Sequence, residues 1–242
     1  MSPKQADPGV RLALMEAGAR LVARGGVEAL TIRRLAAEVG VSTMAIYTHF
    51  GGMEELRSEM QKEAFERLNA RVRSVKATAD PVADLSAMGW MYCSNALAEP
   101  NFYRIMFMED AIDDPDVIAA GVASFEPLVT TVERSVEAKR FRPGDAWNIA
   151  TQMWAMCHGF VTLRLAGMMT DELVMQTLVA MAMNMFVGLG DEPSAAQHSL
   201  ERAIRRMQRQ APLVVAASIP AGRDLHAEDM KTVRQNASPA RA

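Results

Sequence analysis

Apolar residues recur every three or four positions along most of the chain, and this pattern predicts an all-α protein. A first helix is expected over residues 9–24, where the apolar positions form one stripe and Gly25 and Gly26 follow as a stop. A longer helix is expected from about Gly52 into the seventies. The residues that the first helix is expected to bury are Leu14, Met15, Ala17, Gly18, Leu21 and Val22.

Two short amphipathic helices are predicted between these two, over the stretch from Leu30 to Phe50. Thr31 can cap the first with its side-chain oxygen, and Gly40 can end it, because glycine readily adopts the left-handed conformation common at helix C-termini. Ser42 is expected to begin the second in the way that Thr31 begins the first. The spacing of the two helices is that of a helix-turn-helix.

The outward face of the second short helix is suited to a DNA groove. It is predicted to present Thr43, Met44, Tyr47, Thr48 and His49. Methyl groups can touch thymine methyls, hydroxyls can reach base edges or phosphates, and phenol and imidazole groups can bond phosphate oxygens. Arg33 and Arg34 lie early in the preceding helix, within reach of the DNA backbone or a base edge. Two short helices with a glycine turn also occur in many other all-α domains, so the pattern alone leaves that alternative open.

The remaining periodic segments predict a larger C-terminal helical domain. Helices are expected over residues 81–97, 101–108, 117–140 (with a possible interruption near Pro127), 145–168 and 171–189. The first of these is expected to be amphipathic. The last two are apolar around most of their circumference, so each must be covered on more than one side. We therefore predict a homodimer in which these two helices pack on the same pair of a second copy as a four-helix bundle.

Composition and charge refine this picture. Half of the residues are apolar and there are 19 methionines, which suit an adaptable ligand cavity but also replace leucine in ordinary helix cores. The formal net charge is −3, and residues 61–198 carry 11 basic against 18 acidic side chains, whereas residues 1–60 carry seven of each. An acidic body is repelled by DNA, so the N-terminal head is the end expected to dock.

Several other classes of protein are disfavoured. Cys93 and Cys157 belong to no metal-spaced cluster and are expected to be reduced and buried in a cytoplasmic protein. The acidic segment 109–116 lacks the glycine and terminal glutamate of a calcium loop, so no metal is expected. No nucleophile–base motif, phosphate loop or dinucleotide fingerprint is present, so neither an enzyme nor a cofactor is expected. The start of the chain lacks the apolar core of a signal peptide, and the uncharged run 173–190 is short for a membrane span.

Residues 11–56 resemble the N-terminal domain of the tetracycline-repressor (TetR/AcrR) family of transcriptional regulators. The motifs that carry the similarity are RLALMEAGARLVARGG, LTIRRLAAEVGVS and IYTHF followed by GGMEEL. The resemblance implies a homodimeric repressor whose second short helix enters the major groove, with Tyr47 and His49 on phosphates and Ser42, Thr43 and Met44 near bases. The family often has a phosphate-contacting lysine where this chain has Met53, so we expect one backbone contact fewer per subunit and a shallower salt dependence of binding.

A second resemblance lies in the segment WAMCHGFVTLRL. Trp154, His158 and Gly159 match the W-x-x-x-H-G pattern of one C-terminal subclass, the WHG subclass, and EPNFYRIMF is similar to it too. This similarity supports the fold and names no ligand. His158 either offers a hydrogen bond to a ligand or is a buried histidine satisfied by nearby groups, and the second interpretation is the simpler one.

We therefore predict a ligand-responsive transcriptional repressor that binds a palindromic operator and is released by a small, largely apolar effector. Two alternatives remain open. One is an activator, or a regulator with no ligand, in which the pocket is filled core. The other is a helical carrier or enzyme for hydrophobic small molecules with a vestigial DNA-binding head. The candidate DNA-binding residues are Thr31, Arg33, Arg34, Ser42, Thr43, Met44, Tyr47, Thr48 and His49. The candidate ligand-binding residues are Trp90, Phe102, Tyr103, Met106, Trp147, Trp154 and His158.

The expected organisation follows the same order along the chain. Residues 1–8 form a flexible arm, residues 9–56 a helix-turn-helix domain with a linking helix to about residue 78, and residues 79–190 a ligand-binding and dimerisation domain. Residues 191–242 form a basic tail, helical at first and then disordered, which either lies on the acidic body or reaches nucleic acid.

Overall fold

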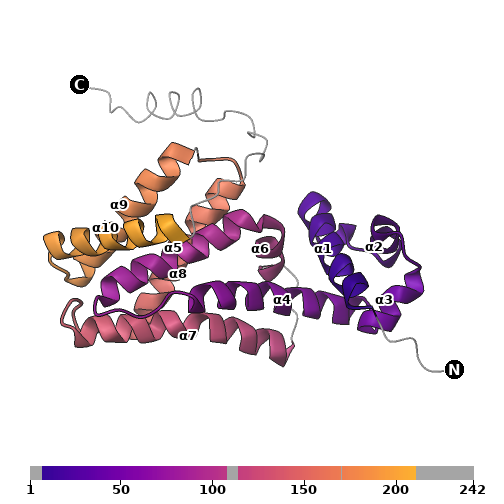
Figure 1. Cartoon of the computed structure of the whole chain (residues 1–242), viewed down its shortest axis with the longest axis horizontal. Helices are drawn as coiled ribbons and strands as arrows, with labels where there is room; N and C mark the ends of the chain where they lie inside the picture. The colour runs from indigo at the N-terminus through magenta and orange to yellow at the C-terminus, as the bar shows by residue number, and fades with distance from the viewer. Residues whose placement is uncertain (1–6, 108–113, 170, 211–242) are drawn as a thin grey trace, which may run out of the picture.

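The computed structural model describes residues 7–107, 114–169 and 171–210, and within these ranges the fold is all-helical, as predicted. Figure 1 shows a small head at one end, a long helix that leaves it, and a larger helical body. Most of the expected arm, residues 109–113 of the acidic segment and the end of the expected tail lie outside the described residues.

The head consists of α1 (Pro8–Gly25), a 3₁₀ turn η1 (Val27–Ala29), α2 (Ile32–Val39) and α3 (Thr43–Phe50). The Thr31 side chain caps α2 by accepting a hydrogen bond from the Arg34 amide (3.3 Å), and Gly40 ends α2 with a left-handed φ of 74°. Ser42 precedes α3 but makes no side-chain capping bond, so the expectation that it caps as Thr31 does is wrong. The stripe predicted for α1 is buried.

The long helix α4 (Met53–Arg73) belongs to both parts of the molecule. Near its start, Leu56 and Met60 are fully buried in the head. A Cβ on Gly18 of α1 would lie 2.8 Å from the Met60 sulfur, so this glycine lets the two helices approach closely. Further along, Leu68 and Val72 are buried in the body. Any tilt of α4 therefore moves the head relative to the body.

The central helix of the body is α5 (Pro81–Ala98). We expected an amphipathic helix here, and this expectation is wrong. The helix is buried on all sides, and its run from Trp90 to Leu97 is buried without a break. Asp84, at 1% exposure, is ion-paired with Arg134 of a later helix (3.1 Å). The pattern of α5 was misleading because a polar residue such as Asp84 can be buried when it is paired with distant residues of the protein.

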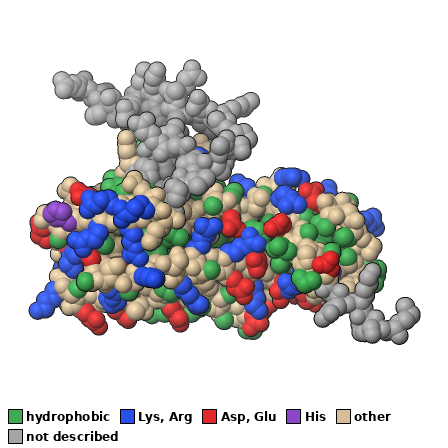
Figure 2. All heavy atoms as spheres, in the orientation of Figure 1, with side chains coloured by type: hydrophobic (Ala, Val, Ile, Leu, Met, Phe, Trp, Pro, Cys, Tyr) green, Lys and Arg blue, Asp and Glu red, His purple; other side chains and the backbone are tan. Residues whose placement is uncertain are grey.

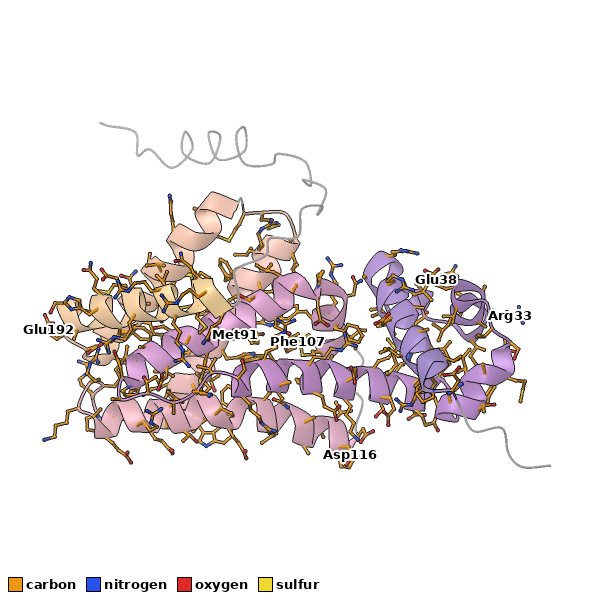
Figure 3. All side chains as sticks on the ribbon, viewed as in Figure 1. Arg33, Glu38, Met91, Phe107, Asp116 and Glu192 are labelled. Carbon is orange, nitrogen blue, oxygen red and sulfur yellow. The ribbon has the colours of Figure 1, made fainter. Side chains whose placement is uncertain are left out.

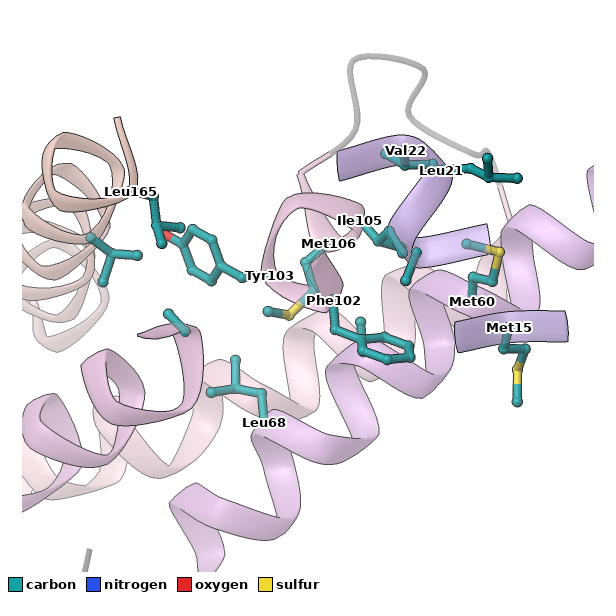
Figure 4. Close-up of a cluster of buried hydrophobic side chains, with 14 of the residues drawn as sticks. Met15, Leu21, Val22, Met60, Leu68, Phe102, Tyr103, Ile105, Met106 and Leu165 are labelled. Atoms are coloured by element: carbon teal, nitrogen blue, oxygen red, sulfur yellow. The ribbon is translucent and has the colours of Figure 1, made fainter. Parts of the chain in front are cut away.

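The short helix α6 (Pro100–Met106) packs against the head. Figure 4 shows Ile105 and Met106 in the buried cluster that also holds Leu21 and Val22 of α1. The Gln61 side chain of α4 donates a hydrogen bond to the Ile105 carbonyl (3.2 Å). A second contact thus connects the body with the head, beside α4.

Three more helices belong to the body. Helix α7 (Pro115–Glu137) continues through Pro127, so the expected interruption is wrong, because packing against α4, α5 and α8 outweighs the one backbone hydrogen bond that proline removes. Helix α8 (Ala146–Leu165) begins after Asp145, whose side chain caps it by accepting hydrogen bonds from the amides of Trp147 and Asn148. Helix α9 (Asp171–Leu189) follows.

The last described helix, α10 (Pro193–Gln210), covers α5. Its Arg202 pairs with Asp80 (3.1 Å) and its Arg206 with Asp84 (3.6 Å). The first part of the expected basic tail therefore lies on the acidic body. Figure 2 shows Lys and Arg side chains gathered over α10. Among the described helices, no segment combines the length and apolarity of a membrane span.

Candidate DNA-binding surface and ligand cavity

The outer face of α3 presents most of the side chains that the sequence assigned to DNA. Met44 is 64% and Tyr47 48% exposed, and Thr43 and Thr48 are exposed beside them. Ile46 of the same helix is fully buried and holds α3 against the head. The Thr48 hydroxyl donates to the Met44 carbonyl (2.9 Å), so only its acceptor lone pairs remain for DNA.

The start of α2 adds positive charge to this surface. Arg33 and Arg34 are exposed, and neither forms an ion pair with any residue in the described ranges. Figure 3 shows Arg33 at the outer end of the head. Glu38 of the same helix pairs instead with Arg20 and Arg24 of α1 (3.6 and 3.4 Å). The two arginines are therefore available for phosphates or base edges.

Two of the predicted DNA contacts, Thr31 and His49, are less accessible. The Thr31 hydroxyl oxygen accepts the hydrogen bond that caps α2, whereas the Ser42 hydroxyl makes no capping bond. His49 is half-buried, and its Nδ1 atom is buried without a hydrogen-bond partner in the described part of the chain. Met53 packs against the hydrophobic core, in keeping with a position that touches no phosphate.

A cavity of about 450 Å³ lies inside the body. It is surrounded by α4, α5, α7, α8, α9 and α10. The wall residues on which the following sections depend are Phe65, Ser86, Trp90, Tyr92, Phe107, Val122, Ser124, Phe125, Trp147, Thr151, Trp154, Cys157 and Phe186. Because α4 supplies part of this wall, the cavity borders the helix that also builds the head.

The three tryptophans predicted for a ligand site, Trp90, Trp147 and Trp154, do line this cavity. The other four predicted residues, Phe102, Tyr103, Met106 and His158, do not line it. Phe102 and Met106 lie in the cluster between body and head instead, because α6 packs on α1 and α4, and Tyr103 bonds His158. Of the described residues 101–107, Phe107 alone lines the cavity.

His158 lies behind the cavity wall in a polar cluster. Its Nδ1 atom is 2.7 Å from the Tyr103 hydroxyl and 3.4 Å from the Tyr92 hydroxyl, and the two hydroxyls are 3.2 Å apart. Burial lowers the pKa of His158 and raises the pKa of Tyr103 to about 12, so all three groups are neutral at physiological pH. His158 is thus a histidine satisfied by neighbouring side chains.

The sequence did not single out several wall residues. Phe65, Phe107, Phe125 and Phe186 come from different helices, and single aromatic residues at helical spacing give no signal that they face a common space. Among the described methionines, Met88, Met153 and Met156 line the cavity, and others, such as Met60 and Met207, are buried in the core. Within the described residues, no group of three or more His, Cys, Asp or Glu side chains could hold a metal ion.

Two family models match the chain. The model for bacterial regulatory proteins of the tetR family matches residues 14–60, and the model for the tetracyclin repressor-like C-terminal domain matches residues 85–186. Together they span more than half of the chain. The chain belongs to the TetR family. This TetR-family protein is therefore a DNA-binding regulator of transcription, and the matched families are regulators and not enzymes.

Individual relatives agree with this assignment. The HTH-type transcriptional regulator Rv0681 of Mycobacterium tuberculosis is 25% identical over 162 residues, which are 66% of this chain and 72% of that protein. The transcriptional repressor KstR2 of the same species is 28% identical over 99 residues, 40% of this chain and 49% of the repressor. A solved structure of a protein of unknown function from Rhodococcus sp. RHA1 is 28% identical, with a TM-score of 0.67, over 79% of this TetR-family chain and all of that one. The likeness to the WHG subclass stays a prediction.

Proposed function

We propose that this TetR-family regulator is a homodimeric repressor that binds a palindromic operator and leaves it when a small, largely apolar effector occupies the cavity. One observation carries the proposal: α4 contributes Leu56 and Met60 to the core of the DNA-binding head and Phe65 and Leu68 to the cavity wall. A ligand that shifts this helix therefore shifts the head. The repressor relative KstR2 supports the direction of regulation.

Contact with DNA is assigned to the exposed face of the head. Helix α3 enters the major groove with Thr43 and Met44 near base edges, and Tyr47 bonds a phosphate. Arg33 and Arg34 approach the backbone or a base edge. Ser42, Thr48 and His49 complete the surface, whereas Thr31 acts through its cap on α2 and sets the angle of that helix.

Dimerisation is assigned to the outer faces of α8 and α9. These faces include exposed apolar residues, among them Leu163 at 45% and Leu173 at 45% exposure. Arg164 is the one charged residue of α8 and is buried. Paired in a dimer, the two heads would meet half-sites one helical turn apart, about 34 Å. Since the proposed target is bacterial DNA, we place the protein in the cytoplasm.

Release follows from linkage between the two sites. An effector lowers operator affinity only if it binds more tightly to a conformation in which the two heads are wrongly spaced. The cavity provides the place for such differential binding, and α4 together with the contact between α6 and α1 provides the connection.

The test is binding of the purified full-length protein to its own upstream DNA, measured by fluorescence anisotropy across a salt series. We expect tight binding at physiological salt with two subunits per site, and dissociation when a compound that raises the melting temperature is added. Binding that vanishes at modest salt and ignores sequence would contradict the proposal and favour a carrier of hydrophobic molecules.

A further inference from the structure

The aromatic residues of the chain are concentrated around the cavity. All three tryptophans, four of the eight phenylalanines and one of the three tyrosines line it. Aromatic faces and edges pack well against the rings of a ligand. We propose that the cavity selects uncharged, ring-containing ligands that need no polar anchor, and that it rejects the corresponding carboxylates. This proposal rests on the proposed function, because it names the class of ligand that the effector site would bind.

The described part of the wall offers nothing to balance a ligand charge. Among the residues that the structure describes, no Asp, Glu, Lys, Arg or His side chain lines the cavity. An ionised carboxylate placed there would lose its hydration without gaining a partner of opposite charge, which strongly disfavours binding. The apolar part of the same ligand would still gain from leaving water. The cavity therefore distinguishes compounds by charge even when their carbon skeletons are identical.

The hydroxyl groups of the wall are already engaged as donors. Ser86 donates to the Val82 carbonyl (2.8 Å), Ser124 donates to the Gly121 carbonyl (2.6 Å), and Thr151 donates to the Trp147 carbonyl (2.8 Å). Tyr92 points its hydroxyl at the Tyr103 and His158 cluster behind the wall. A carboxylate only accepts hydrogen bonds, so none of these hydroxyls can bind it without giving up an existing bond.

One exposed part of the wall does not favour an anionic headgroup either. Val122 and Trp147 of the wall are 45% and 51% exposed. Beside Trp147, the Asp145 carboxylate accepts hydrogen bonds from the first amides of α8 (2.9 and 3.3 Å). A ligand carboxylate left beside Trp147 would therefore meet a like charge.

The three tryptophans make binding directly measurable. Because every tryptophan of the chain lines the cavity, intrinsic fluorescence excited near 295 nm reports ligand entry without any DNA present. The probes are limonene, perillyl alcohol and perillate, which share one ten-carbon ring skeleton and end in a methyl group, an alcohol and a carboxylate. Decanol and decanoate form a second pair without a ring. All titrations use the full-length protein at pH 8, where both acids are ionised.

We expect limonene and perillyl alcohol to bind with similar affinity and perillate to bind at least tenfold more weakly. Decanol should bind more weakly than perillyl alcohol, and decanoate more weakly than decanol. Equal or tighter binding of either carboxylate would overturn the exclusion of anions. Preference for decanol would overturn the preference for rings, and no binding of either neutral ring compound would overturn the ligand class itself.

Three variants test the absence of a polar anchor. Ser86→Ala, Ser124→Ala and Thr151→Val should leave the ratio of perillyl alcohol to limonene affinity unchanged, because these hydroxyls already donate to their own helices. A variant whose affinity for perillyl alcohol falls while its affinity for limonene stays the same would identify an anchor and refute the inference. If limonene binds as expected but does not release operator DNA, the proposed repressor mechanism fails while the ligand class stands, so the two failures are distinguishable.

Discussion

At the scale of single residues, Tyr47 tests the DNA-binding assignment most directly. It is a phenol held half in solvent on a helix whose opposite side is buried in the head. Tyr47→Phe removes only the hydroxyl and should weaken operator binding by about 1–2 kcal/mol if that hydroxyl bonds phosphate. Fluorescence anisotropy with the upstream DNA measures the change.

The matched control for Tyr47 is Tyr92→Phe. It removes the hydroxyl that Tyr92 points at Tyr103 and His158 behind the cavity wall, and it should leave operator affinity unchanged in the absence of effector. If Tyr47→Phe binds operator as tightly as the unaltered protein, its hydroxyl has no role at the phosphate. If both variants lose affinity equally, the effect is one of general stability and says nothing about the interface.

Asp84 is the residue whose loss should cost most stability in the body. At 1% exposure it pairs with Arg134 (3.1 Å) and Arg206 (3.6 Å) and accepts a hydrogen bond from the Thr78 amide (2.8 Å). Asp84→Ala should lower the free energy of unfolding by about 2–3 kcal/mol, less than for a fully buried pair because both arginines are partly exposed.

Urea unfolding at fixed protein concentration, followed by circular dichroism, measures this loss. The control is Glu201→Ala, which breaks an exposed pair with Arg205 (3.5 Å) and should change stability by less than about 0.5 kcal/mol. A loss at Asp84 no larger than that at Glu201 would mean that solvent replaces the ion pairs fully.

At the scale of elements, the sequence predicted helices well where each helix has one solvent-exposed face and one buried face. The stripe of α1, the cap and glycine stop of α2, and the Asp145 cap of α8 could be read locally, because each depends on residues within a few positions. The pattern failed at α5, where every face is buried, and at Pro127, where packing keeps α7 continuous. Both outcomes depend on contacts between distant segments.

The caps of α2 and α3 give a matched comparison within one motif. Thr31 accepts a hydrogen bond from the Arg34 amide, and Ser42 makes no such bond. Thr31→Ala should therefore lower the free energy of unfolding by about 1 kcal/mol, whereas Ser42→Ala should cost only a few tenths. Thermal unfolding without DNA measures both. Equal losses would show that Ser42 caps α3 in solution.

At the scale of the whole molecule, the cavity shows where prediction from sequence ends. The sequence offered Trp90, Trp147 and Trp154 as candidates, and all three line the cavity. It also offered Phe102 and Met106, which lie in the cluster between body and head, and Tyr103, which bonds His158 behind the cavity wall. Which apolar residues surround a space and which fill a junction depends on how helices pack, and no local pattern records that.

The uncharged outer face of α8 provides the last test, of the dimer. Ala155 is exposed on this face, and a Cβ built on Gly159, one turn further, would meet nothing within 4 Å. Ala155→Glu would bury an unpaired carboxylate in the proposed interface and should yield a monomer at micromolar concentration in sedimentation velocity. Operator affinity should fall by roughly 100-fold or more, because one head loses the help of the other. Ala70→Glu on the exposed side of α4 is the control and should stay dimeric. A dimeric Ala155→Glu variant with full operator affinity would place the interface elsewhere, since a carboxylate tolerated at that position cannot be buried between subunits.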